Sequence, residues 1–185
     1  TLVGINSYWG CKWGIMSYDL GRTPRILVGS EHLKDVSALV RSLRCESVFL
    51  VVDAVVAQGD YIKHFQNLDL PISTFVMLAG EPTVATVNAA VAQARTLTDT
   101  VIIGLGGGSA LDTAKQIAGV LASDKPLEHY LLCANPWYGR RPMIAVPTAA
   151  GTGSEVTRTC IVSHQGRKMW TWGDELLPDI VILDP

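Results

Sequence analysis

Continuous apolar runs that recur between helical stretches constrain the fold of this sequence more than any other feature. The clearest runs are SVFLVVD (47–53), TVIIGLG (100–106), MIAVP (143–147) and PDIVILDP (178–185). A strand without polar alternation is buried on both faces, and such strands belong to parallel sheets whose crossover helices cover both faces. The sequence therefore predicts the α/β class, with a mostly parallel sheet and helices on both of its faces.

The segments between these runs fit the same alternation. Further strands are predicted at RILVG (25–29) and ISTFVML (72–78), and a β-hairpin near the C-terminus where EVTRTCIVS (155–163) turns through HQGRK into KMWTW. Helices are predicted from a cap at Ser30 to about Leu43, over 55–67, from the turn at 81–83 to about Leu97, and after the glycines at 106–108. With 185 residues and no linker or repeat, we expect one Rossmann-like domain over residues 1–185.

The segment VIIGLGGGSALDTAK (101–115) carries the strongest local signal for function. Three successive glycines, Gly106 to Gly108, leave backbone amides free of Cβ atoms at the end of a predicted strand. We expect Ser109 to cap the following helix, with Asp112 three residues on in an S-x-x-D arrangement like a capping box. Unpaired amides and the positive end of the helix dipole favour a phosphate, so the loop predicts pyrophosphate binding. The alternative is a flexible turn that binds nothing.

Polar groups at other predicted strand ends are candidates for contacting the same ligand. Asp53 ends a buried strand, where a carboxylate accepts hydrogen bonds from ribose hydroxyls and repels a 2′-phosphate, which favours NAD over NADP. A turn-forming aspartate is an equal alternative. The turn VPTAAGTGSEVT (146–157) adds the hydroxyls of Thr148 and Thr152, unless it is only a solvent-exposed crossover. Lys168 could reach a phosphate or ribose, although most single lysines are merely solvated.

Composition excludes several other classes of protein. The net charge of −2 gives no electrostatic footprint for a nucleic acid or an anionic membrane. No apolar run reaches the roughly 18 residues of a membrane-spanning helix, and the first residues lack a secretory signal. The 4 cysteines and 4 histidines are scattered, without a C-x-x-C pair or the histidine spacing of a zinc helix. We therefore expect a cytoplasmic protein with reduced thiols and no metal ligands within this chain.

GGGSALDTAKQIA (106–118) and VPTAAGTGSEVT (146–157), at this separation, resemble the iron-containing alcohol dehydrogenase family. Flanking features agree, since PRILVGSEHL is similar to the family's opening strand and loop, LVVD to its first nucleotide strand and EPT to the turn before a long helix. The resemblance covers residues 20–185 and implies a domain that binds a nicotinamide dinucleotide. The two motifs together are highly specific.

The resemblance also implies roles for individual residues. The residues matching the family's cofactor-binding positions are Asp53, Glu81, Gly107, Gly108, Ser109, Asp112, Thr148, Thr152 and Lys168. Among these, the GGGS loop matches the pyrophosphate site and Asp53 the residue that contacts the adenosine ribose. Two positions depart from the pattern: Ala149 replaces the second threonine of PTTAGTGSE, and Glu81 stands where many members have asparagine.

For the intact protein, the resemblance implies an NAD(P)-dependent alcohol dehydrogenase or aldehyde reductase that transfers a hydride between nicotinamide and a small alcohol or aldehyde. The family holds Fe²⁺ or Zn²⁺ with an aspartate and three histidines on a following all-helical domain, and its members form dimers or larger homo-oligomers. Because the sequence ends at Asp184-Pro185, we expect either a fragment cut at a domain boundary, inactive alone and without catalytic residues, or a naturally short chain. The alternatives are a related enzyme such as glycerol dehydrogenase or maleylacetate reductase, and a non-catalytic nucleotide-binding or assembly module.

Overall fold

The computed structural model describes residues 22–78 and 80–184, so residues 1–21 of the predicted domain lie outside the described part. Its strands are β1 (Arg25–Val28), β2 (Ser47–Asp53), β3 (Ile72–Met77), β4 (Thr100–Gly106), β5 (Met143–Pro147), β6 (Thr159–His164), β7 (Arg167–Trp172) and β8 (Ile180–Leu183). Its α-helices are α1 (Val36–Ser42), α2 (Tyr61–Gln66), α3 (Val84–Ala94) and α4 (Gly108–Val120). Short 3₁₀ turns are η1 (His32–Asp35), η2 (Val56–Gln58), η3 (Leu127–Cys133), η4 (Ser154–Val156) and η5 (Asp174–Leu176).

A six-stranded sheet with the order β1-β8-β5-β4-β2-β3 forms the centre of the molecule, and every neighbouring pair in it is parallel. β6 and β7 form a separate antiparallel hairpin, joined through the register pair Ile161↔Trp170. The predicted α/β class, parallel sheet and C-terminal hairpin are therefore confirmed. The apolar runs lie where burial is greatest, since all residues of β4 are buried.

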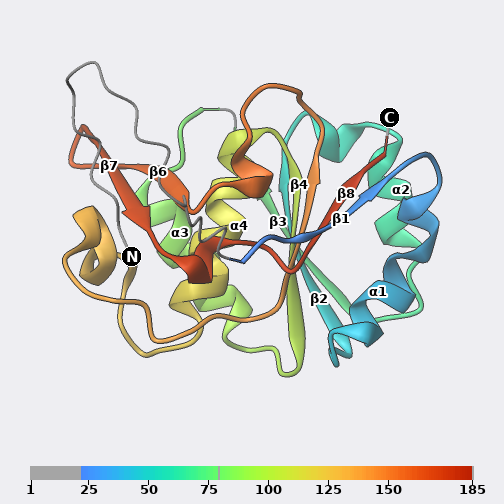
Figure 1. The fold of residues 1–185 in the computed structure, drawn as a ribbon, viewed down its shortest axis with the longest axis horizontal. Coiled ribbons are helices and arrows are strands. Elements are labelled where there is room, and N and C mark those ends of the chain that lie inside the picture. Colours follow the sequence, from blue (N-terminus) through green and yellow to red (C-terminus); the bar gives the residue numbers. More distant parts are fainter. Residues whose placement is uncertain (1–21, 79, 185) are drawn as a thin grey trace, which may run out of the picture.

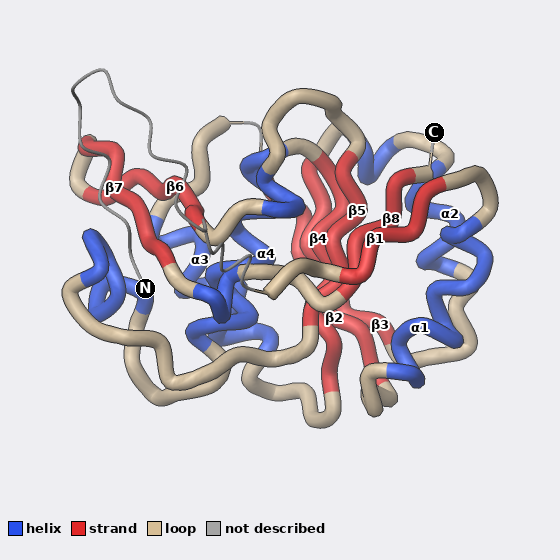
Figure 2. The backbone as a smooth tube through the Cα atoms, in the orientation of Figure 1, coloured by secondary structure: helices blue, strands red, loops and turns tan. Residues whose placement is uncertain are grey.

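Helices cover both faces of this sheet (Figures 1 and 2). Alternate residues of β2 explain the arrangement, because Phe49 and Val51 pack into one core and Val48, Leu50 and Val52 into the other. The first core contains the apolar residues of α3, α4 and the inner side of β6. The second contains those of α1 and α2. A strand buried on both sides needs apolar residues at every position, which is why these runs lack alternation.

α4 approaches the sheet more closely than an ordinary side chain would allow. A Cβ atom at Gly104, in the middle of β4, would lie 2.9 Å from the Cβ of Ala114 and 3.2 Å from a methyl group of Leu111. The glycine thus lets the helix pack directly on the strand. This contact fixes the direction in which the N-terminus of α4 leaves the end of β4.

Two predicted helices begin or run differently in the structure. Ser30 does not cap a helix, because Glu31 precedes η1 with a φ of 79° and α1 begins only at Val36. The helix expected over 55–67 is divided into η2 and α2, since Gly59 between them has an extended backbone. The geometry of the caps and turns determines where these helices begin and end. The spacing of apolar residues carries no information about that geometry.

The third helix starts from the expected turn but ends earlier than expected. α3 begins after Thr83, whose hydroxyl accepts a hydrogen bond of 3.1 Å from the amide of Thr86, and it ends at Ala94 rather than near Leu97. Threonine at this position satisfies one of the free amides of the first turn. No helix among the described residues has both the length and the apolar character needed to cross a bilayer.

Candidate functional site

The adjacent strands β2 and β4 end in residues that the sequence analysis selected. Their register pairs Val52 with Leu105, so Asp53 and Gly106 lie at the same edge of the sheet. α2 follows β2 on one face and α4 follows β4 on the other. The two connections therefore diverge and leave a crevice at the carboxyl ends of these strands, which is where parallel α/β sheets bind ligands.

Gly106 permits a close approach between the two strand ends. Its φ is +147°, and a Cβ atom there would lie 2.5 Å from Oδ2 of Asp53 and 2.9 Å from the Cβ of Ala110. A side chain at this position would therefore displace the carboxyl group of Asp53. Packing between the two strand ends therefore requires a glycine at position 106, whether or not a ligand binds there.

Gly107 and Gly108 have different surroundings from Gly106. No atom of the described residues, its chain neighbours aside, lies within 4 Å of a Cβ atom placed on Gly107, so its backbone faces open space. A Cβ atom on Gly108 would lie 3.2 Å from the methyl group of Thr152, which brings the second polar turn against the glycine loop. Gly107 thus leaves room for a ligand to reach the backbone, and Gly108 lets the two loops pack together.

The N-cap of α4 lies at Gly107, two residues earlier than the expected cap at Ser109. Gly107 occupies the capping position with an extended backbone, and Ser109 is an exposed residue of the first turn. The expected capping by Ser109 with Asp112 is therefore wrong, because the carboxylate of Asp112 binds elsewhere. The first amides of this 13-residue helix lack a capping side chain, which leaves them available to an anion.

Asp53 forms a turn at the end of β2. Its Oδ1 accepts hydrogen bonds from the amides of Val55 (3.1 Å) and Val56 (2.8 Å), while Oδ2 lies 3.4 Å from the amide nitrogen of Gly107. The turn-forming interpretation is thus correct. Because Oδ2 makes only this one long contact with the described part of the chain, it retains capacity for a further donor, and the ribose contact stays a prediction.

Two neighbouring grooves follow the carboxyl edge of the sheet. The glycine groove, of about 490 Å³, is lined by five of the predicted residues, which are Asp53, Gly107, Gly108, Ser109 and Thr148. Exposed Val55 and Leu78 give it an apolar side beyond Asp53. The strand-end groove, of about 600 Å³, is lined by the ends of β1, β5 and β8, the turn at 148–151, Tyr61, Glu155 and Asp184. Tyr61, Thr148 and Ala149 line both, so the grooves adjoin.

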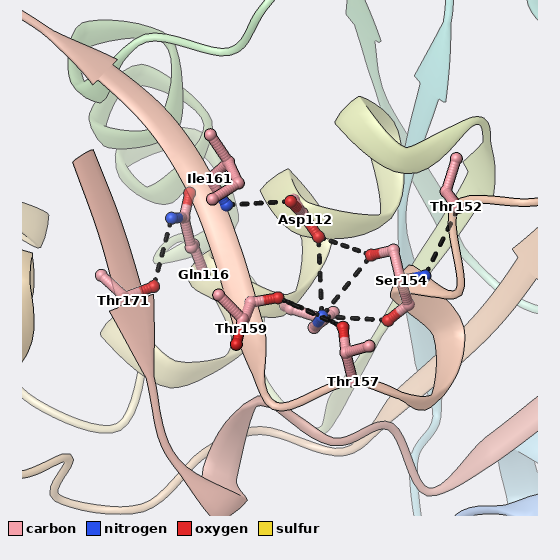
Figure 3. Close-up of polar contacts among 9 residues, drawn as sticks. Asp112, Gln116, Thr152, Ser154, Thr157, Thr159, Ile161 and Thr171 are labelled. Carbon is pink, nitrogen blue, oxygen red and sulfur yellow. Dashed lines mark hydrogen bonds and ion pairs between the residues drawn. The ribbon is translucent and has the colours of Figure 1, made fainter. Parts of the chain in front are cut away.

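Asp112 lies beside these grooves in a network of polar contacts (Figure 3). Its Oδ1 accepts a hydrogen bond from the hydroxyl of Ser154, and its Oδ2 accepts one of 2.9 Å from the amide of Ile161. Thr152 continues the network, since its hydroxyl oxygen lies 3.4 Å from the amide nitrogen of Ser154. Asp112 thus joins α4 to the second polar turn and to β6, and neither groove is lined by it.

Lys115 is the central donor of this network, and its role was not predicted from the sequence. Its side chain is completely buried, and its Nζ donates at 2.9 Å to the carbonyl oxygens of both Ser154 and Thr159. The same Nζ lies 3.5 Å from Oδ1 of Asp112. A lysine one helical turn after an aspartate within an otherwise apolar helix face was the available signal. The lysine holds the second polar turn in place.

The two remaining predicted residues pair with each other. Nζ of Lys168, on β7, lies 3.6 Å from Oε2 of Glu81, which precedes α3. The Lys168 side chain is 77% exposed, and neither residue lines the two grooves. A cofactor role for this exposed pair stays a prediction.

A metal centre is not assembled by the residues that the structure describes. Within residues 22–78 and 80–184, no group of three or more histidine, cysteine, aspartate or glutamate side chains could hold a metal ion. The described residues therefore do not fit a metal.

Comparison of sequences relates the chain to known dehydrogenases. Residues 23–185 match the family described as iron-containing alcohol dehydrogenase. The chain is 32% identical to the 1-propanol dehydrogenase of Citrobacter freundii over 158 residues, which are 80% of this chain and 38% of that protein. It is 36% identical to the 4-hydroxybutyrate dehydrogenase of Cupriavidus necator over 166 residues, which are 83% of this chain and 44% of that protein. The chain thus spans less than half the length of these relatives.

Solved structures show the same relation in three dimensions. The sulfoacetaldehyde reductase of Bifidobacterium kashiwanohense, in complex with NAD⁺, superposes with a TM-score of 0.84 and 26% identity, over 92% of this chain and 46% of that one. An iron-containing alcohol dehydrogenase of Thermococcus thioreducens superposes with a TM-score of 0.75 and 22% identity, over 88% of this chain and 45% of that one. The second likeness shows the fold alone.

Proposed function

Because the chain belongs to the iron-containing alcohol dehydrogenase family, we propose that it forms the dinucleotide-binding domain, over residues 1–185, of an NAD-dependent alcohol dehydrogenase or aldehyde reductase. One observation carries the proposal. Gly107 exposes its backbone to open space at the N-terminus of α4, in the groove that also contains Asp53. This arrangement suits a diphosphate next to a ribose.

Different parts of the glycine groove contact different parts of the dinucleotide. The amides of the first turn of α4 bind the diphosphate, because they lack partners within the helix and lie at the positive end of its dipole. Oδ2 of Asp53 accepts a hydrogen bond from a ribose hydroxyl, and the negative charge of this carboxylate disfavours the 2′-phosphate of NADP. The apolar side formed by Val55 and Leu78 covers the adenine, and Thr148 supplies a hydroxyl where the two grooves adjoin.

The intact enzyme would act on a small alcohol or aldehyde. The relatives named above are dehydrogenases or reductases of 1-propanol, 4-hydroxybutyrate and sulfoacetaldehyde, which supports this class of substrate. When bound, the dinucleotide would supply or accept the hydride. A metal, Fe²⁺ or Zn²⁺, and assembly into a homo-oligomer belong to the proposal for the intact enzyme.

Substitution of Gly107 tests the position of the diphosphate. We expect Gly107→Val to raise the dissociation constant for NAD about tenfold or more, because the new side chain fills the space beside the amides. Gly59→Val is the matched control, since Gly59 has φ −89° and ψ −176° where Gly107 has φ −76° and ψ −174°. The extended backbone at both positions accommodates a side chain, so both variants should fold. Gly59 lines neither groove, so its substitution should not affect binding.

Calorimetric titration of the unaltered chain and both variants with NAD and NADP gives the result. Unchanged affinity for NAD in the Gly107 variant would place the diphosphate elsewhere and refute the proposal. Equal or tighter binding of NADP by the unaltered chain would refute the role of Asp53, without affecting the assignment of the glycine loop.

A further inference from the structure

Within residues 22–78 and 80–184, Glu155 has an unpartnered carboxylate oxygen beside the strand-end groove. It is the middle residue of η4 (Ser154–Val156) and one of the residues that line this groove. Its Oε2 is buried, and no hydrogen-bond donor reaches it from the described part of the chain. A buried carboxylate oxygen without a partner is unfavourable, and a positive charge placed in the adjoining groove would offset part of that cost.

The strand-end groove is acidic. Its charged lining residues are Glu155 and Asp184, and among the residues that the structure describes no lysine, arginine or histidine lines it. Lys115, the lysine of the network around Asp112, directs its amino group to Ser154, Thr157, Thr159 and Asp112. Asp184 is partly satisfied, because its Oδ2 accepts a hydrogen bond of 3.2 Å from the amide of Leu33. Glu155 therefore contributes the less compensated negative charge.

The proposed function sets which end of the cofactor reaches this groove, and the inference rests on it. With the ribose of adenosine at Asp53, on β2, and the diphosphate at Gly107, after β4, the remaining half extends past Thr148 at the end of β5. Thr148 lines both grooves, so this half enters the strand-end groove. The nicotinamide half is thus the part that approaches Glu155.

We propose that Glu155 is a specificity-determining residue that makes this groove favour the oxidised dinucleotide over the reduced one. The oxidised nicotinamide ring carries a positive charge and the reduced ring is neutral, whereas the carboxamide, ribose and diphosphate are common to both. A carboxylate shielded from water attracts the charged ring more strongly than it would in bulk solvent. The two forms therefore differ in affinity through the charge of Glu155.

The experiment compares dissociation constants for NAD⁺, NADH and ADP-ribose in the 185-residue chain. We expect Glu155→Gln to lower the ratio of the NADH constant to the NAD⁺ constant roughly three- to tenfold, as for one partly screened charge pair. Binding of ADP-ribose should not change, because it lacks the nicotinamide. Glu155→Asp keeps the charge and should retain most of the ratio.

Glu175→Gln is the matched control. Glu175 is also the middle residue of a three-residue 3₁₀ turn, η5 (Asp174–Leu176), and is half-buried like Glu155, but it lines neither groove. This variant should leave all three constants unchanged.

The outcomes separate this inference from the proposed function. If Glu155→Gln leaves the ratio unchanged, or weakens both redox forms equally, Glu155 does not sense the charge of the ring and the inference fails alone. If the unaltered chain does not bind ADP-ribose, the proposed function fails and the inference fails with it.

Discussion

Replacement of Lys115 by methionine should destabilise the domain more than most single substitutions. The amino group is completely buried and donates to two carbonyl oxygens at 2.9 Å, those of Ser154 and Thr159. Methionine retains most of the apolar stem, so the change leaves little empty volume. The loss comes from the acceptors, which would be left in a water-poor region together with the carboxylate of Asp112.

The magnitude follows from removing one member of a buried charged pair. Such a change costs about 3–5 kcal/mol, because the remaining charge stays buried without compensation. A domain of this size has a total free energy of unfolding of about 5–15 kcal/mol, so the variant would lose a large part of it. Lys168→Met is the control, since the Lys168 side chain is 77% exposed and its loss should cost less than about 1 kcal/mol.

Urea denaturation followed by tryptophan fluorescence measures both variants. A loss below about 1 kcal/mol for Lys115→Met would refute the reasoning, because the contacts would then contribute no more than a surface lysine does. A double-mutant cycle with Asp112→Asn isolates the charged pair. We expect the second substitution to recover part of the loss, since it neutralises the orphaned carboxylate.

Three further predictions concern other parts of the described chain. Gly106→Ala should cost about 1–3 kcal/mol in urea denaturation, because the methyl group would meet the carboxylate of Asp53 at a φ of +147°; an unchanged midpoint would contradict this. Burial raises the pKa of the Cys160 thiol to about 12, so mass mapping after alkylation at about pH 8 should find exposed Cys133 labelled and Cys160 protected until the chain unfolds. Burial acts to raise the pKa of the Asp179 carboxyl group. Hydrogen bonds from Arg140 and from the backbone amide of Met143, together with the positive charges of Arg140 and Arg22, outweigh burial and hold this pKa below its ordinary value. The carboxylate therefore contributes stability at neutral pH that is lost as the pH falls through its lowered pKa, and the deficit of Asp179→Asn in urea denaturation should shrink below about pH 4; a constant deficit would contradict this.

The bounds of the central strands could be predicted because a strand buried on both faces requires a continuous run of apolar residues. SVFLVVD and TVIIGLG coincide with β2 and β4, and MIAVP with β5. Helix starts were predicted less well. A polar residue such as Ser30 or Ser109 can cap a helix only if the backbone before it turns correctly, and neighbouring segments decide that turn.

Some residues of the candidate site could likewise be predicted from the sequence, and others could not. The glycine loop and Asp53 were identified from their positions after strands, and the structure places them in one groove. Lys115 was missed, because its partners lie about 40 residues further along the chain, where no local pattern connects them to it. Asp112 was selected, but its hydrogen bonds to Ser154 and Ile161 could not be inferred from spacing.

By itself, the sequence determined the class of fold and the end of the sheet at which a ligand would bind. Apolar runs specify strands buried on both faces, and the carboxyl ends of parallel strands lie at one edge whatever the details of packing. Only the tertiary structure decided which polar groups remain free at that edge. Within the residues that the structure describes, Gly107 is left open, Asp112 binds Ser154 and Ile161, and Glu155 keeps an oxygen without a partner. Hydrogen bonds between distant segments make these choices, and such bonds depend on distances that a linear sequence does not contain.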